Sequence, residues 1–161
     1  MEPRLDVMHA SPAAIGAMLG LTAHLTTSGL ESSLIHLIFM RASQINGCAN
    51  CLDMHSKDAR AAGETEQRLY LVNAWRESPF YSDRERAALE WTEALTLVSA
   101  THVPDDVYRA ARAQFSEQEL VDLTLAVVAI NGWNRICVGF RVQPGAYQPK
   151  QQRHRGSHAE H

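Results

Sequence analysis

The sequence lacks the features that would direct it to a membrane or to a nucleic acid. Its first residues, MEPRLD, do not show the charged-then-apolar pattern of a secretory signal. The longest dense apolar run, residues 34–40, is interrupted by His36 and is too short to span a bilayer. The formal net charge of -3 offers no general attraction to nucleic acid or to an anionic membrane. We therefore expect a cytoplasmic protein without a nucleic-acid or membrane partner.

The sequence also has few strand signals, no internal repeat and no glycine-rich phosphate loop. Helix signals recur along the chain instead, and they predict helices that begin near Pro12, Glu31, Cys48, Thr65, Ser82, Pro104 and Ser116. The short connections predict an all-α bundle of six to seven helices. A chain of 161 residues suits one domain, which we assign to residues 1–142. Residues 143–161 are polar and are expected to form a disordered tail.

Two helix starts carry a reciprocal capping pattern. Ser82 is followed three residues later by Glu85, and Ser116 is followed by Glu119. In such a capping box each side chain accepts a hydrogen bond from the other residue's backbone N–H. Residues 34–40 are apolar on nearly every side of a helix, which predicts that this helix is buried in the core.

The three cysteines include one closely spaced pair, Cys48 and Cys51, at a predicted helix start after Asn46-Gly47. In a reducing compartment such a pair is more typical of catalysis or metal binding than of a structural disulfide. The unpaired N–H groups and the dipole at a helix start favour thiolate over thiol. His55 lies four residues after Cys51 on the same helical face, where it can accept the proton of Cys51. Oxidation would give a sulfenic acid at one cysteine, and the other would then close a disulfide.

Other interpretations of these residues remain open. The spacing can be a coincidence, or Cys48, Cys51, His55 and His36 can form a structural zinc site. A thioredoxin-like fold is disfavoured because it would need strands. Cys137, near the last predicted core helix, is expected to be a small buried hydrophobe with an inert thiol.

Residues 41–55, RASQINGCANCLDMH, closely resemble the core motif of the alkylhydroperoxidase AhpD-like branch of the carboxymuconolactone decarboxylase family. The resemblance extends from about residue 10 to 142 and includes a second segment, EWTEALT, at residues 90–96. It implies an all-helical protomer that assembles into homotrimers or homohexamers and that a dithiol protein re-reduces. It also implies that Cys51 meets the peroxide, that Cys48 completes the disulfide and that His55 relays the proton.

Two positions differ from the pattern of better-known members. A glutamate twelve residues before the first cysteine completes their proton relay, and this position is His36 here. The mycobacterial member has histidine directly before the second cysteine, where this chain has Asn50. A second histidine can shuttle protons but orients His55 only weakly. Glu90 or Glu93 of the second segment could supply the missing carboxylate from another helix, and we favour Glu93.

These observations predict an alkylhydroperoxidase-like enzyme, either a thiol peroxidase or a disulfide-relay protein, that acts on small hydroperoxides. Its expected catalytic residues are Cys48, Cys51, His55, His36 and Glu93. We expect no metal and no bound cofactor. The alternatives are a carboxymuconolactone decarboxylase-type lyase and a non-catalytic structural or zinc-binding oligomer. Decarboxylation does not need two cysteines, which disfavours the lyase.

Overall fold

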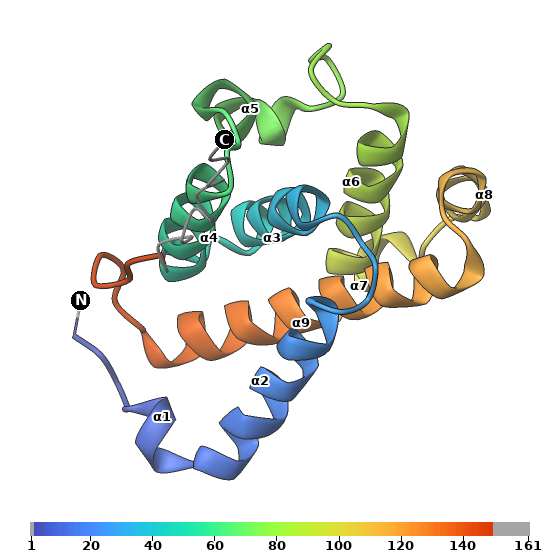
Figure 1. Cartoon of the computed structure of the whole chain (residues 1–161). Coiled ribbons are helices and arrows are strands. Elements are labelled where there is room, and N and C mark those ends of the chain that lie inside the picture. The colour runs from blue at the N-terminus through green and yellow to red at the C-terminus, as the bar shows by residue number, and fades with distance from the viewer. Residues whose placement is uncertain (1, 150–161) are drawn as a thin grey trace, which may run out of the picture.

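The computed structural model describes residues 2–149, and within that range the chain forms helices and no strand (Figure 1). The elements in chain order are α1 (Val7–Ala10), α2 (Pro12–Leu25), α3 (Ser32–Asn46), α4 (Ala49–Ala61), α5 (Glu66–Leu71), the 3₁₀ turn η1 (Val72–Ala74), α6 (Asp83–Thr96), α7 (Val98–Thr101), α8 (Asp105–Gln114) and α9 (Glu117–Phe140). The predicted all-α class is confirmed.

The helix starts that carry capping boxes are confirmed in detail. The Ser82 hydroxyl accepts the N–H of Glu85, and the Glu85 carboxylate accepts the N–H of Ser82. The Ser116 and Glu119 pair caps α9 in the same way. The helix predicted to begin near Thr65 is short, because α5 ends at Leu71 and the chain continues as the 3₁₀ turn η1, as helix ends often do. The short helices α1 and α7 were not predicted.

Helix α3 runs through the centre of the molecule, with α4, α6 and α9 around it (Figure 1). Ile38 and Leu37 are neighbours in sequence, and both are fully buried. Ile38 belongs to a core cluster shared with α9, which contributes Val127. Leu37 belongs to a second cluster, which includes Leu89 of α6. Since α3 is covered on both sides, the apolar pattern around residues 34–40 is explained, and the predicted burial is confirmed.

Helix α9 is the longest element, with 24 residues, and it packs against α2, α3 and α6. Length and a mean hydropathy of 1.3 would let it cross a membrane by composition alone. Core helices of globular proteins can meet the same criteria, and Leu123, Val127 and Ile130 of α9 are buried against other helices here. On its outer face Val121 and Val128, two turns apart, are 60% and 52% exposed.

The chain after α9 returns to α4. The backbone N–H of Gly145 donates to the carboxylate of Asp53, at 3.0 Å. Lys57 donates to the carbonyl of Tyr147, and the Tyr147 hydroxyl donates to the carboxylate of Asp58 at 2.6 Å. These residues belong to the predicted polar tail, of which residues 143–149 are described and residues 150–161 lie outside the described residues.

Candidate active site

The sequence Asn46-Gly47-Cys48 forms the corner between α3 and α4. Gly47 takes a left-handed conformation, with φ of 64°, which glycine adopts without a steric penalty and which ends α3. Cys48 is then the residue that caps α4, and its carbonyl accepts the N–H of Leu52. Cys51 lies in the first turn of α4. Both sulfurs are therefore near the unpaired N–H groups of a helix start, as the sequence predicts.

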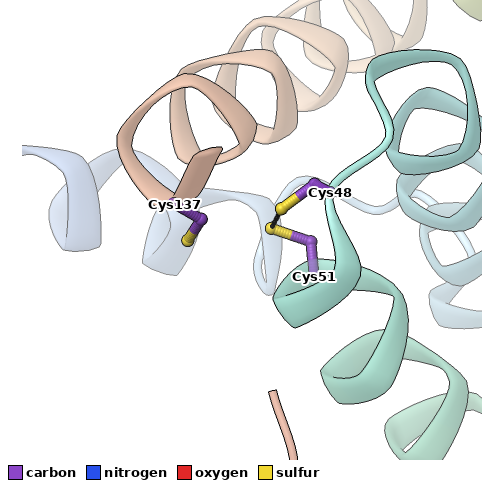
Figure 2. Close-up of side chains that lie close together, drawn as sticks. All are labelled: Cys48, Cys51 and Cys137. Atoms are coloured by element: carbon purple, nitrogen blue, oxygen red, sulfur yellow. Dashed lines mark hydrogen bonds between the residues drawn. The ribbon is translucent and has the colours of Figure 1, made fainter. Parts of the chain in front are cut away.

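Three sulfur atoms form a buried cluster at this corner. The Sγ atoms of Cys48 and Cys51 are 2.8 Å apart, and both side chains are at most 1% exposed. Cys137 of α9 lies beside the pair, and the three Sγ atoms all lie within 4.8 Å of one another (Figure 2). Cys137, expected to be an inert packing residue, is thus part of the cluster.

The hydrogen bonds of the cluster favour one negative charge, on Cys48. Hydrogen bonds from the thiols of Cys137 and Cys51 lower the pKa of Cys48 to about 3. The same contacts act in the opposite direction on the donors. Hydrogen bonds to Cys137 and Cys48 raise the pKa of Cys51, and the hydrogen bond to Cys48 raises the pKa of Cys137 to about 11. These hydrogen bonds therefore favour a thiolate at Cys48 over one at Cys51 or Cys137.

Amide side chains fix the corner behind Cys48. Asn134 of α9 is 1% exposed and donates to the Ser43 hydroxyl at 3.0 Å. The Asn46 amide donates to the side-chain oxygen of Asn134, at 2.9 Å. A hydrogen bond from Asn134 also contributes to the lowered pKa of Cys48. The sequence does not indicate this role of Asn134, because an asparagine in an apolar helix carries no local signal for a partner so distant along the chain.

Cys48 and Cys137 line a hollow of about 330 Å³, which we name the cysteine cavity. Asn50, between the paired cysteines, and Arg141, at the end of α9, also line it. Cys51 is fully buried and does not line this cavity. A small molecule in the cysteine cavity would therefore meet the sulfur of Cys48 before that of Cys51.

The two candidate histidines line a different hollow, of about 310 Å³, which we name the histidine cavity. The ring of His55 packs against Phe39, with 4.8 Å between ring centres, and burial lowers the pKa of His55 to about 4. Negative charge at Cys48 acts on His55 in the opposite sense, but more weakly than burial. Within the described chain no hydrogen bond joins His55 to either thiol of the pair. His55 is thus a neutral base near the dithiol.

His36 of α3 also lines the histidine cavity. Its Nδ1 atom is buried and has no hydrogen-bond partner among residues 2–149. Burial lowers the pKa of His36, so this ring is neutral at pH 7 as well. The structure thereby brings His36 and His55 to one cavity, and one nitrogen of His36 is left available there.

A carboxylate that was not among the predicted site residues lies close to His55. Asp58 of α4 lies three residues after His55, and its Oδ2 is 4.0 Å from Nδ1 of His55. Its other oxygen accepts the hydroxyl of Tyr147, and this hydrogen bond raises the pKa of Tyr147 to about 12. The spacing of three on one helix was the signal that could have identified Asp58.

Glu93 of α6 lies in a separate polar cluster. Its carboxylate accepts hydrogen bonds from Arg41 at 2.6 Å, from the Trp75 indole at 2.9 Å and from Arg76 at 2.6 Å. Burial alone would raise the pKa of Glu93, but these three donors outweigh it and lower the pKa. Glu93 therefore joins α3 and α6 to the chain around η1, and none of its contacts within residues 2–149 is with His55. Glu90 forms an ion pair with Arg76 at 3.6 Å.

Among the described residues, the potential metal ligands that come together are Cys48, Cys51 and Cys137. Three thiolates would suit a soft ion such as Cu(I) or zinc. The four-ligand zinc site considered from the sequence is not assembled, because His36 and His55 do not join this group.

Residues 10–94, just over half of the chain, match the model of the carboxymuconolactone decarboxylase family. The chain belongs to this family. The uncharacterized protein YdfG of Bacillus subtilis (strain 168) is 42% identical over 140 residues, which are 87% of this chain and 95% of YdfG. YnjA of Escherichia coli (strain K12), also uncharacterized, is 33% identical over 100 residues, which are 62% of this chain and 54% of YnjA.

Solved structures support the AhpD-like branch. A protein of unknown function from Agrobacterium tumefaciens, assigned provisionally to antioxidant defence as AhpD, is 48% identical and has a TM-score of 0.88. The match covers 91% of this chain and all of that one. The debrominase Bmp8, at 22% identity, shares the fold with a TM-score of 0.75 over 86% of this chain and 75% of its own. The predicted AhpD-like identity is confirmed, and it indicates a function related to peroxidases.

Proposed function

We propose that this protein is a dithiol peroxidase that reduces a small hydroperoxide through Cys48 and Cys51. The observation that carries the proposal is the position of the Cys48 sulfur, which lies 2.8 Å from the sulfur of Cys51 and lines the cysteine cavity, and hydrogen bonds lower the pKa of Cys48. A thiolate is the reactive form of cysteine, and a second thiol at this distance can close a disulfide. The proposal places the protein in the cytoplasm, where a reducing environment regenerates the thiols.

The first chemical step is assigned to Cys48 rather than to Cys51, which the family resemblance favoured. The thiolate of Cys48 attacks the terminal oxygen of the hydroperoxide, the S–O bond forms and the O–O bond breaks. The alkoxide takes a proton from water and leaves as an alcohol, and Cys48 becomes a sulfenic acid. Two features support this order, because Cys48 has the lowered pKa and also lines the cavity.

The second step joins the two cysteines. The sulfur of Cys51 attacks the sulfenic sulfur of Cys48, a disulfide forms, and hydroxide leaves and is protonated to water. The thiol of Cys51 must lose its proton in this step, and its raised pKa makes a base useful. We assign that role to His55, whose transient positive charge Asp58 would stabilise from 4.0 Å. His36, in the same cavity, is a second neutral base that can pass the proton on.

Single-turnover oxidation tests the proposal. One equivalent of tert-butyl hydroperoxide should remove two of the three thiols in the folded protein, counted by alkylation and mass spectrometry. In the Cys51→Ser variant, Cys48 should give a sulfenic acid that dimedone traps or a disulfide made with another thiol. If all three thiols of the folded wild-type protein stay reduced, the peroxidase proposal is wrong.

We also propose that the protein self-associates as a homotrimer or homohexamer. Helix α3 is buried within its own chain, so it offers no surface to another copy. The outer face of α9 exposes Val121 and Val128, and contact with another copy would remove these two apolar side chains from water. Light scattering should give a mass of three or six chains. A monomeric mass would contradict this, and Val128→Lys should lower the mass of an oligomer built on α9.

A further inference from the structure

We propose that Cys137 is a third redox thiol, which takes the disulfide over from Cys51 and presents it to the reductant in the cysteine cavity. This inference rests on the proposed dithiol chemistry. The exchange is balanced: the sulfur of Cys137 bonds to Cys48, the bond between Cys48 and Cys51 breaks, and the proton of Cys137 passes to Cys51. No external oxidant or reductant is consumed in this step.

The position of the sulfurs supports the exchange. Cys137 Sγ lies within 4.8 Å of both partners, and a disulfide joins sulfurs at about 2.05 Å. Rotation of the Cys137 side chain and a small shift of the end of α9 would close that distance. Cys137 is near this end, because α9 stops at Phe140 and Arg141 takes a left-handed conformation. Helix ends are the parts of a helix that move at the lowest cost.

The difference in access explains why an exchange would help. Cys51 is 0% exposed and does not line the cysteine cavity, whereas Cys137 is 9% exposed and does. A reducing dithiol must approach a disulfide sulfur directly, so in the disulfide of Cys48 with Cys51 it could attack only Cys48, which is 1% exposed. A disulfide between Cys48 and Cys137 would have both sulfurs on the wall of the cavity.

The electrostatics of Cys137 change in the direction that the exchange needs. In the reduced protein the hydrogen bond to the Cys48 thiolate raises the pKa of Cys137 to about 11, so Cys137 is a poor nucleophile. After the first disulfide forms, Cys48 carries no charge and Cys51 has no thiol. The larger of their two effects on the pKa of Cys137, the raising effect of Cys48, is then lost, so this pKa falls although burial still raises it. Cys137 is therefore restrained before oxidation and released after it.

Asn50 supplies a donor for the sulfur of Cys137. Its amide lies 3.6 Å from Cys137 Sγ, and this hydrogen bond lowers the pKa of Cys137. Asn50 stands between the two cysteines of the motif, so one residue of the dithiol turn reaches the third thiol. The donor would stabilise the thiolate that attacks Cys48.

The test begins with the Cys51→Ser variant, treated with diamide, which forms disulfides without peroxide. The expected product is an intramolecular disulfide between Cys48 and Cys137, mapped after alkylation in acid. Free Cys48 and Cys137 in the folded variant would overturn the inference. Since no hydroperoxide is used, this result does not depend on the peroxidase proposal.

The wild-type protein gives the second arm. After oxidation by diamide, the disulfide of Cys48 with Cys137 should appear as the disulfide of Cys48 with Cys51 declines. Dithiothreitol should re-reduce oxidised Cys137→Ser about tenfold more slowly than oxidised wild type. Cys137→Ala provides a second variant if serine disturbs the fold, and Asn50→Ala should slow the exchange while Cys137 remains present. Equal re-reduction rates in folded wild type and both Cys137 variants would contradict the inference.

Discussion

The two cavities that α4 borders have opposite effects on charged side chains. In the cysteine cavity, hydrogen bonds lower the pKa of Cys48 to about 3 and so favour its anion. In the histidine cavity, burial lowers the pKa of His55 to about 4 and so disfavours its cation. The site thus does not resemble a thiolate–imidazolium pair. The thiolate is stabilised by neutral donors, and the histidines remain free to accept protons.

The largest effect should come from the cysteine cavity. Cys48→Ser removes the thiolate, and we expect hydroperoxide reduction to fall by at least about a thousandfold, since serine is a far weaker nucleophile. Cys51→Ser should still consume one equivalent of hydroperoxide in its first turnover and then stop. Stopped-flow measurement of hydroperoxide consumption distinguishes the two. If Cys51→Ser fails to react while Cys48→Ser reacts once, Cys51 is the attacking sulfur.

Substitution of Glu93 tests whether this carboxylate, which lies outside the histidine cavity, takes part in catalysis or only stabilises the fold. Glu93→Gln leaves Arg41 and Arg76 with weaker partners, and we expect the free energy of unfolding to fall by about 3 kcal/mol. Glu117→Gln is the matched control, because the side chain of Glu117 is 90% exposed, and it should cost less than about 1 kcal/mol. Urea unfolding measures both. If Glu93→Gln leaves the stability unchanged but greatly lowers the peroxidase rate, Glu93 takes part in catalysis.

The pH dependence of the free energy of unfolding should show that His55 is neutral in the folded protein. The unfolded chain binds a proton at His55 below about pH 6.5, while the folded protein does so only near pH 4. The stabilising contribution is therefore complete above pH 6.5 and is lost as the pH falls toward 4. From pH 7 to pH 5 the contribution of His55 to the free energy of unfolding should therefore fall by about 2 kcal/mol. Urea unfolding should show that the free energy of unfolding of His55→Gln changes less between pH 7 and pH 5 than that of the wild type. If the two proteins show the same change, the pKa of folded His55 is ordinary.

The smallest effect concerns proton transfer between the cavities. His55→Gln should slow disulfide closure about tenfold, because Cys51 loses its base, while oxidation of Cys48 continues. Longer survival of the Cys48 sulfenic acid, measured by dimedone trapping, would report this. His9→Gln is the control, since His9 is 87% exposed at the far end of the chain. If closure in His55→Gln is as fast as in the control, His55 has no part in the step.

The sequence predicts the structural features that depend only on residues adjacent in the chain. The capping boxes at Ser82 and Ser116 and the turn at Gly47 require only a few adjacent residues, and all three are present. The burial of residues 34–40 follows from the apolar pattern alone. The turn at Gly47 also predicts that Cys48 and Cys51 lie at the start of the next helix.

The contacts between residues that are far apart in the sequence could not be predicted, because they depend on how the helices pack. Cys137 lies 87 positions after Asn50, yet the two are in contact, and nothing near Cys137 in the sequence indicates this. Glu93 matched a family-like segment, but three donors from elsewhere in the fold fix its carboxylate away from His55. Asp58 differs from these residues, because its position three residues after His55 on one helix is enough to predict that the two side chains are neighbours.

The central claim is that Cys48 carries the negative charge of the cluster. Thiolates absorb in the ultraviolet where thiols do not, so a pH titration of the reduced, folded protein measures the charge directly. The account predicts the absorbance of one thiolate per chain from about pH 8 down to about pH 5, and its loss in Cys48→Ser. Absorbance that appears only above about pH 8, or that persists undiminished in Cys48→Ser, would contradict it.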